Sequence, residues 1–294
     1  MKTPRISLLE WQKHFGTEKA CADAIAKFRW PDGFICPKCA NKAAWYISSR
    51  KVYQCSKCRH QTSITAGTLF HSTNLPLVKW FWAIFLMASD KGGISATRLA
   101  KQIGVSWPTA RKMLKKLRMA MAHRDSLYRL FEELIEMDDT YIGGKRSGKR
   151  GRGAGGKKPV LVAVERRDKK SGFIAMEAVD TVSGETVKSF LKRHLQKGRH
   201  VRTDAYPALN VIKDDHIHEK KVTPPDKASS WLPKVHIVIG NLKKFLNGKY
   251  HGVSHQYLQE YLDEFCYRFN RRYWEAELPF RLLNASVAHA PITG

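Results

Sequence analysis

Two acidic motifs in the second half of the sequence contain residues that could bind divalent metal ions. Asp138 and Asp139 lie in the motif EMDDTY, and Asp204 lies in the motif RTDAY. We expect Asp138 on the first strand and Asp204 at the end of the fourth strand of an α/β layer domain. In a three-stranded meander followed by a helix and a parallel strand, the first and fourth strands are neighbours, so Asp138 and Asp204 could share metal ions.

A carboxylate pair of this kind suits two-metal phosphodiester chemistry, in which one Mg²⁺ activates the attacking oxygen and the other stabilises the leaving oxygen. The alternative is that strand-end aspartates only cap turns. Asp139 is the weaker candidate of the adjacent pair.

Four of the six cysteines form two C-x-x-C pairs, and fifteen residues separate the pairs. Each pair can place two thiolates on one side of an ion, so the four can close a tetrahedral shell around zinc: Cys36, Cys39, Cys55 and Cys58. A closed shell leaves no position for substrate, so we predict a structural zinc ion that holds a segment with little core. A redox pair is the alternative, but redox motifs are rarely doubled. Cys21 and Cys266 fall in apolar helical patterns and are expected to be buried thiols.

Residues 94–117 have the pattern of a helix-turn-helix. The first helix ends at a glycine turn, Gly104, and the second begins after Ser106 with Pro108 in its first turn. The inner face of the second helix is apolar, and its outer face is basic. The residues expected to contact a DNA groove are Trp107, Thr109, Arg111, Lys112 and Lys115. An ordinary corner between two bundle helices is the alternative.

The charge balance predicts a polyanionic partner. The chain has 52 Lys and Arg against 26 Asp and Glu, a net charge of +26, which opposes a compact fold unless it is partly neutralised. Nucleic acid is the expected partner; a basic ribosome-like protein and a membrane-surface protein are the alternatives. The N-terminus lacks the apolar core of a signal peptide, and no stretch has the ~18 apolar residues of a membrane span. We therefore expect a cytoplasmic, nucleoid-associated protein with no membrane partner.

These residues belong to an expected α+β multidomain chain. The four parts are N-terminal helices at 1–30, a zinc ribbon at 31–72, a helical helix-turn-helix region at 75–125 and an α/β catalytic domain with C-terminal helices at 130–285. In the last part the hydrophobic pattern predicts strands at 134–142, 160–165, 173–178 and 201–203, and helices at 185–195, 236–247 and 255–269.

A glycine-rich loop interrupts this domain at 143–158, with seven basic residues and no acidic one. We expect a mobile hairpin loop that can lie along phosphates, and a merely solvated loop is the alternative.

Four motifs resemble those of bacterial insertion-sequence transposases with an N-terminal zinc ribbon, a central helix-turn-helix and a DDE-type domain. They are DDTYIGG at 138–144, TDAY at 203–206, NLKK at 241–244 with GKYH at 248–251, and YLDEFCYRFNRR at 261–272. The similarity covers nearly the whole chain, because the ribbon, the helical middle and the basic loop occur in the family order. It implies an RNase H-like catalytic fold in which Asp138 and Asp204 are the first two ligands of Mg²⁺ or Mn²⁺.

The resemblance also implies that Glu264, Arg268 and Arg271 lie on one face of the C-terminal helix, near the DNA or the active site. Their spacing of four and three residues suits an intrahelical salt bridge equally well.

The chain departs from the family pattern at the third catalytic carboxylate. A glutamate is expected near the start of the helix at 236–247, seven residues before a lysine, but His236 occupies that place before Lys243. Because the family includes members with asparagine in third place, Asn241 is the nominal third residue, and His236 is the rival that fits the spacing better. Either is a weaker ligand than glutamate for Mg²⁺. Lys243 or Lys244 would contact the DNA backbone near the cut.

The resemblance implies a transposase that binds the terminal inverted repeats of its element, cuts at the element ends and transfers the 3′ ends to target DNA. The expected partners are double-stranded DNA and, by analogy with the family, further copies of the chain. The missing third glutamate favours a DNA-binding regulator or an inactive relic as the alternative. A nuclease of the same fold that lacks strand transfer is a further possibility.

Overall fold

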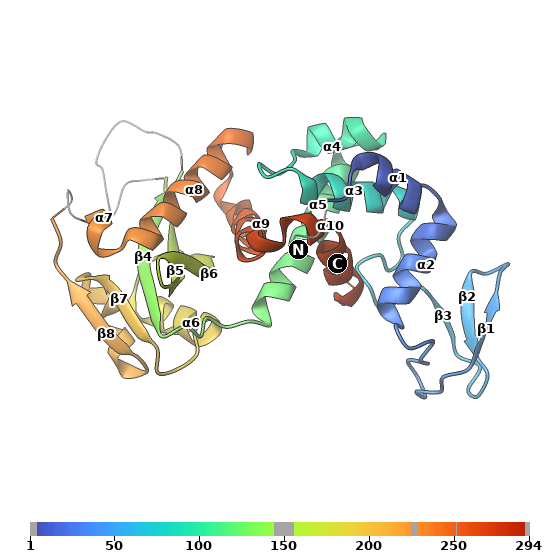
Figure 1. The fold of residues 1–294 in the computed structure, drawn as a ribbon, viewed down its shortest axis with the longest axis horizontal. Helices are drawn as coiled ribbons and strands as arrows, with labels where there is room; N and C mark the ends of the chain where they lie inside the picture. The colour runs from blue at the N-terminus through green and yellow to red at the C-terminus, as the bar shows by residue number, and fades with distance from the viewer. Residues whose placement is uncertain (1–4, 144–155, 225–227, 251, 292–294) are drawn as a thin grey trace. The chain divides into compact units, whose positions relative to one another are not determined.

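The structure, a computed structural model, describes residues 5–143, 156–224, 228–250 and 252–291, so the predicted basic loop lies largely outside the described residues. The chain divides into two compact units (Figure 1). Unit 1 comprises Met1–Met121 with Trp274–Gly294, and unit 2 comprises Ala122–Tyr273.

Helices in unit 1 begin where the sequence supplies capping side chains. Ser7 accepts a hydrogen bond from the N–H of Glu10, whose carboxylate accepts one from the N–H of Ser7. Glu18 caps the helix that begins at Leu77, which is far away in the sequence, since its carboxylate accepts hydrogen bonds from the N–H groups of Leu77 and Val78. The helices of unit 1 are α1 (Leu8–Phe15), α2 (Glu18–Arg29), α3 (Leu77–Ser89), α4 (Ala96–Ile103), the first part of α5 (Trp107–Ser126) and α10 (Leu278–Ala288).

The core of these helices is largely aromatic. Trp11 of α1 is almost fully buried and lies within 6.2 Å, between ring centroids, of Phe81, Phe85 and Phe280. Phe280 comes from α10, which packs against α3. The last helix of the chain therefore belongs to the same core as the first.

A small three-stranded antiparallel sheet follows α2. Its strands are β1 (Ala44–Ile47), β2 (Val52–Cys55) and β3 (Gln61–Ser63), in the order β1-β2-β3. Tyr53 of β2 contacts the rings of Trp30 and Phe34, so one face of this sheet packs against the segment that follows α2.

Unit 2 is built on a five-stranded mixed sheet. The strands are β4 (Leu134–Ile142), β5 (Lys158–Arg167), β6 (Lys170–Ala178), β7 (His200–Asp204) and β8 (Ile217–Lys221), in the order β6-β5-β4-β7-β8. β4, β5 and β6 form an antiparallel meander, and β7 and β8 run parallel to β4. This arrangement confirms the expected RNase H-like fold.

Helices cover both faces of this sheet. Helix α6 (Gly184–His194) and the 3₁₀-helix η1 (Pro207–Asp214) share a core with one face, which includes Met137, Leu161 and Val201. Helices α8 (Pro233–Tyr250) and α9 (Leu258–Asn270) share a core with the other, which includes Val162 and Met176. Figure 1 shows α8 beside β4 and β5.

Several elements of the structure were not predicted from the sequence, among them β8, α10 and the short helices η1 and α7 (Ala228–Trp231). The edge strand β8 was not expected, because its sequence IHEKK has a single apolar residue. Helix α10 was not predicted either.

The prediction of buried thiols is confirmed, since Cys21 and Cys266 are both buried and burial raises the pKa of each thiol. Among the described helices, none is long and apolar enough to cross a bilayer.

Candidate functional site

Asp138 and Asp204 lie on neighbouring parallel strands and face the same side of the sheet. The β4–β7 pairing aligns Glu136 with Arg202, and the same offset places Asp138 opposite Asp204 at the end of β7. Asp138 also pairs with Val162, whose side chain belongs to the core beneath α8. Both carboxylates therefore lie on the α8 face, near the carboxyl ends of their strands.

Asp139 lies on the opposite face. Its partner across β5 is Leu161, which belongs to the core beneath α6. The pleat of β4 therefore separates the two adjacent aspartates and leaves only Asp138 on the side of Asp204.

Helix α8 brings His236 to the same place. The Nδ1 atom of His236 lies 3.9 Å from Oδ2 of Asp138, whose side chain is 14% exposed. The structure therefore groups the side chain of Asp138 with that of His236, although 98 residues separate them in the sequence.

A buried glutamate fixes the start of α8. Oε2 of Glu136 accepts hydrogen bonds from the N–H groups of Lys234, at 2.7 Å, and Val235, at 3.0 Å. Glu136 is fully buried and lies on the same face of β4 as Asp138, two residues away. A carboxylate at a helix N-terminus satisfies N–H groups that lack partners within the helix and complements the helix dipole. This contact sets the helical position of His236, the next residue after Val235.

The rival third residue, Asn241, lies elsewhere on α8. At 100° per residue, five positions turn the helix by about 140° relative to His236, and Asn241 is exposed. Lys243 is seven positions from His236, which returns it to about the same face, and it is also exposed. The structure therefore brings His236, and not Asn241, to Asp138.

Glu264 is fully buried on α9 in a salt bridge. Its Oε1 accepts hydrogen bonds from Nε and Nη2 of Arg268, at 3.0 and 2.9 Å, and the hydroxyl of Tyr250 lies 3.5 Å from its Oε2. Tyr250 is fourteen residues beyond His236, or ~21 Å along α8. The structure does not bring Glu264 to the two aspartates.

Arg271 has a partner within unit 2 as well. Its Nη1 lies 2.5 Å from Oδ1 of Asp125, and Asn270 donates a hydrogen bond to the other oxygen of that carboxylate. The side chains of Arg268 and Arg271 are 10% and 15% exposed. Both guanidinium groups therefore make ion pairs in largely buried surroundings.

The donor set at Asp138 fits a divalent cation. The carboxylate of Asp138 supplies a charged oxygen of the kind that Mg²⁺ and Mn²⁺ favour, and the imidazole of His236, 3.9 Å away, can add a nitrogen ligand. Among the described residues, only the four cysteines place three or more such donor atoms all within 4.8 Å of one another, so Asp204 would join this pair as a metal binds. Helix α8 has no acidic residue along its whole length. A cation held here would therefore meet fewer charged oxygens than a site with three carboxylates offers.

The four predicted zinc ligands form a closed cluster. The Sγ atoms of Cys36, Cys39, Cys55 and Cys58 all lie within 4.8 Å of one another. Two of these separations, from Cys36 to Cys58 and from Cys39 to Cys55, are 3.6 Å. Four ligands at the Zn–S distance of ~2.3 Å stand ~3.8 Å apart in a tetrahedron, so the cluster fits zinc.

Both cysteine pairs form the same backbone turn. The carbonyl of Cys36 accepts a hydrogen bond from the N–H of Ala40, and that of Cys55 accepts one from Arg59. Ala40 and Arg59, each directly after the second cysteine of its pair, have positive φ angles of 56° and 59°. The backbone N–H groups of Cys58 and Lys57 lower the pKa of the Cys55 thiol.

The predicted helix-turn-helix consists of α4 and α5. Ser95 caps α4, Gly104 ends it with a φ of 62°, and the hydroxyl of Ser106 accepts a hydrogen bond from the N–H of Thr109. The expected inner residues of α5 are buried, namely Ala110, Met113, Leu114 and Leu117. Of the expected DNA-contacting residues, Trp107, Lys112 and Lys115 are exposed, while Thr109 and Arg111 are half-buried.

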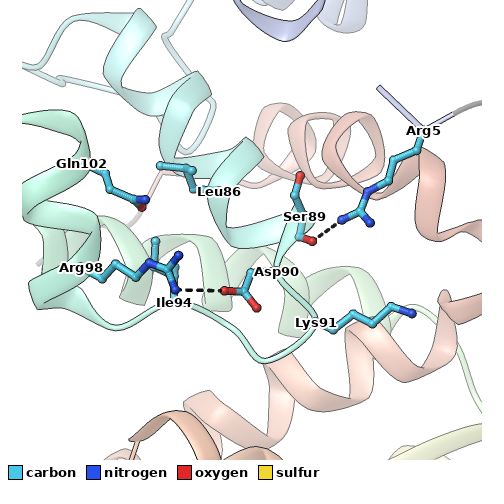
Figure 2. A pocket seen from close by; sticks show the side chains of 8 residues that line it. All are labelled: Arg5, Leu86, Ser89, Asp90, Lys91, Ile94, Arg98 and Gln102. Atoms are coloured by element: carbon cyan, nitrogen blue, oxygen red, sulfur yellow. Dashed lines mark hydrogen bonds and ion pairs between the residues drawn. The ribbon is translucent and has the colours of Figure 1, made fainter. Parts of the chain in front are cut away.

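A pocket of about 360 Å³ lies beside α4 (Figure 2). Arg98 and Gln102 contribute to it from α4, and Arg98 forms an ion pair of 3.6 Å with Asp90. Arg5 donates a hydrogen bond to the carbonyl of Ser89 (Figure 2). The pocket includes none of the predicted catalytic residues.

Sequence reasoning did not identify Glu136 as part of the site. The available signal was its place in the motif EMDDTY, two residues before Asp138 and on the same strand face. Its hydrogen bonds to α8 depend on a contact across about a hundred residues of sequence, which the motif does not indicate.

Two protein families match separate parts of the chain. Residues 130–270 match the ISXO2-like transposase domain, and residues 16–61 match the transposase zinc-ribbon domain. Together the two matches cover more than half of the chain. A protein of Halobacterium salinarum, described as an uncharacterized protein in transposable element ISH50, is 27% identical over 222 residues, which are 69% of this chain and 72% of that protein.

Solved structures of Mos1 transposase share a lower sequence identity with the chain. The Mos1 strand transfer complex has a TM-score of 0.31 and 13% identity, and the match covers 73% of this chain and 79% of that chain. The catalytic domain of Mos1 mariner transposase has a TM-score of 0.29 and 14% identity, and the match covers 59% of this chain and 90% of that chain. The family matches confirm the predicted combination of zinc ribbon and transposase domain.

Proposed function

The chain belongs to the insertion-sequence transposases with an N-terminal zinc ribbon and a DDE transposase domain, and we propose that it cuts DNA at the ends of its own element and joins the freed 3′ ends to target DNA. The observation that supports this most directly is the position of Asp138 and Asp204 on one face of two neighbouring parallel strands, with His236 at 3.9 Å from Asp138.

We assign the metal ligands to Asp138 and Asp204, with His236 in the third position. Mg²⁺ or Mn²⁺ bound to these residues would activate the attacking oxygen and stabilise the leaving oxygen of the phosphodiester. Glu136 is a positioning residue, because it holds the start of α8 so that His236 meets Asp138. Lys243, exposed near the same helical face, would contact a phosphate close to the cut.

DNA binding is assigned to the helix-turn-helix and to the zinc ribbon, which both belong to unit 1. The basic outer face of α5 would enter a groove through Trp107, Lys112 and Lys115, with Thr109 and Arg111 at its edge. The zinc ion would hold the ribbon in the shape needed for its own DNA contact. We propose that the catalytic chain works on DNA as a homo-oligomer, because two element ends must be cut and joined together.

The C-terminal arginines are assigned a different role. Glu264, Arg268 and Arg271 form ion pairs within unit 2, so we propose that they hold α9 in place and do not contact the DNA. We propose the domain limits 1–30, 31–72, 75–125 and 130–285, with the difference that the residues from Trp274 onward, which include α10, pack with unit 1 and are kept with it in truncation experiments. We place the chain's action on nucleoid DNA in the cytoplasm.

A DNA-binding regulator or inactive relic is the second candidate function. The observation in its favour is that α8, which covers the site, has no acidic residue to supply a third carboxylate. An imidazole is a weaker ligand than a carboxylate for Mg²⁺, so a relic would bind the element ends and leave them uncut.

The test is a cutting and joining reaction. The purified full-length protein is incubated with labelled duplexes from both ends of its element and a supercoiled target plasmid, in Mg²⁺ or Mn²⁺. We expect cleavage at the element boundary and end-labelled plasmid products. The control is Asp204→Asn, which should bind the duplex as the wild type does and give neither product. Binding without cleavage by the wild-type protein in both metals would favour the regulator or relic, and cleavage without joined products would indicate a nuclease.

A further inference from the structure

One face of the ribbon sheet has a row of side chains, exposed except for the half-buried Gln54, that the zinc site does not use. Trp45, Gln54 and Gln61 are cross-strand neighbours on β1, β2 and β3, so their side chains share one face. The other face, which includes Tyr53, packs against Trp30 and Phe34. We call Trp45, Gln54, Gln61 and the adjacent Arg59 the ribbon row.

The ribbon row combines aromatic, amide and basic groups. Trp45 is 53% exposed, and the guanidinium of Arg59 lies 5.4 Å from the centroid of its ring. Nε2 of Gln61 donates a hydrogen bond of 2.7 Å to Oε1 of Gln54. This bond holds the two amides together, and neither the Nε2 donors of Gln54 nor the Oε1 acceptor of Gln61 takes part in it. An exposed tryptophan between polar neighbours suggests a partner, since large aromatic residues are usually buried.

The charge of this segment identifies the kind of partner. Residues 31–72 contain six Lys or Arg and a single acidic residue, Asp32. A polyanion is therefore favoured over an ordinary protein surface. An amide donor together with an amide acceptor matches the N7 acceptor and N6 donor of adenine in the major groove of duplex DNA. Gln54 and Gln61 lie on the paired strands β2 and β3, and that groove admits two β-strands side by side.

We propose that the ribbon row is a second DNA-reading surface, with Gln54 and Gln61 on a base edge, Arg59 on a phosphate and Trp45 packed against a thymine methyl group or a sugar. This inference rests on the proposed function, because the DNA would be the end of the element. It assigns sequence discrimination to the ribbon in addition to the α5 face.

The experiment measures binding of the full-length protein to a fluorescent duplex from the element end and to a shuffled duplex of the same composition, over a range of salt concentrations. We expect the double variant Gln54→Ala with Gln61→Ala to lose about tenfold or more of its preference for the element end. Trp45→Ala should weaken binding to the element end. Arg59→Gln should weaken binding to both duplexes and reduce the salt slope by about one.

Arg50→Gln is the matched control, because it removes the same charge from an exposed position in the β1–β2 turn outside the ribbon row. It should retain the preference of the wild type. Zinc content, measured for each variant, separates loss of contact from loss of the ribbon fold. Row variants that hold zinc and discriminate as the wild type does would overturn the proposal. So would a change confined to self-association, measured by analytical ultracentrifugation, because the row would then be an interface between copies.

The two proposals fail in different ways. If the row variants lose discrimination but the wild-type protein never cuts, the proposed function is wrong and the ribbon assignment stands. If the protein cuts and the row variants discriminate normally, only the ribbon assignment is wrong.

Discussion

The zinc cluster and the proposed acidic site of this chain are built over very different lengths of sequence. The four zinc ligands lie within residues 36–58, and each pair is positioned by its own tight turn. The proposed acidic site draws Asp138, Asp204 and His236 from two strands and a helix spread over 99 residues. The first site depends on local backbone geometry, whereas the second depends on the packing of a whole unit. Changes in the sequence should therefore disturb the two sites through different causes.

The largest effect is expected at the zinc cluster. Cys39→Ser removes one of four thiolates, and structural zinc in small domains contributes ~10–16 kcal/mol of binding free energy that is also folding free energy. We expect zinc content to fall from about one equivalent to nearly none, with rapid proteolysis inside residues 31–63. The control is Cys21→Ala, which removes a buried thiol outside the cluster. A Cys39→Ser protein that keeps its zinc would contradict the four-ligand assignment.

The next effect separates the two rivals on α8. His236→Ala removes the side chain beside Asp138 and should lower the rate of cleavage by ~100-fold, since a metal-positioning group is worth a few kcal/mol. Asn241→Ala, an exposed position on another face of the same helix, should stay within about twofold of the wild type. Cleavage rates with the element-end duplex test both. The reverse ranking would make Asn241 the third residue.

A smaller effect concerns the helices that cover the acidic site. Burial raises the pKa of the Asp263 carboxyl on α9 to about 7, against ~3.9 in an unfolded chain. Between these values the unfolded state loses its proton before the folded state does, so the wild type loses stability as pH rises from about 4 to 7. Asp263→Asn removes this penalty. We expect it to raise the unfolding temperature by about 2–4 °C at pH 8 and by less near pH 4.

Thermal melts of both proteins across this pH range measure the difference. A stabilisation of equal size at pH 4 and pH 8 would contradict the titration of Asp263.

The smallest effect tests the local geometry of the zinc turns. Ala40 has a φ of 56°, a region that glycine adopts without a steric penalty. Ala40→Gly should therefore change zinc affinity and ribbon stability by no more than about 0.5 kcal/mol, because relief of strain offsets the added freedom of the unfolded chain. Ala44→Gly, on strand β1, has no such relief and should cost about 0.5–1 kcal/mol. Competition with a zinc chelator measures the zinc affinity of both variants. Equal losses of affinity for Ala40→Gly and Ala44→Gly would contradict the special backbone conformation of the turn at Ala40.

The sequence was informative wherever a pattern is local. The strand 134–142 matches β4 at both ends, because its alternation and length are those of a strand. The cysteine spacing predicted a cluster that the structure confirms. The adjacency of the strands that carry Asp138 and Asp204 followed from the predicted strand order, whereas the face that the two side chains share is known only from the strand register.

Other features depend on contacts that no local pattern contains. The position of His236 rather than Asn241 near Asp138 depends on where α8 begins, and the buried carboxylate of Glu136 fixes that start from a distant strand. Strand β8 is polar because it is an edge strand, so its hydrophobic signal is weak. The association of α10 with α3 is a long-range contact between the two ends of the chain.

The most direct measurement compares cleavage of the element-end duplex by Asp138→Asn, Asp204→Asn, the double variant and Asp139→Asn, each at a concentration where it binds the duplex fully. If Asp138 and Asp204 form one metal site, each single variant should lose ~1,000-fold or more in rate, and the double variant should lose no more than either alone. Asp139→Asn, on the opposite face of β4, should remain within a few-fold of the wild type. Wild-type rates for Asp204→Asn, or an equal loss for Asp139→Asn, would contradict the shared site.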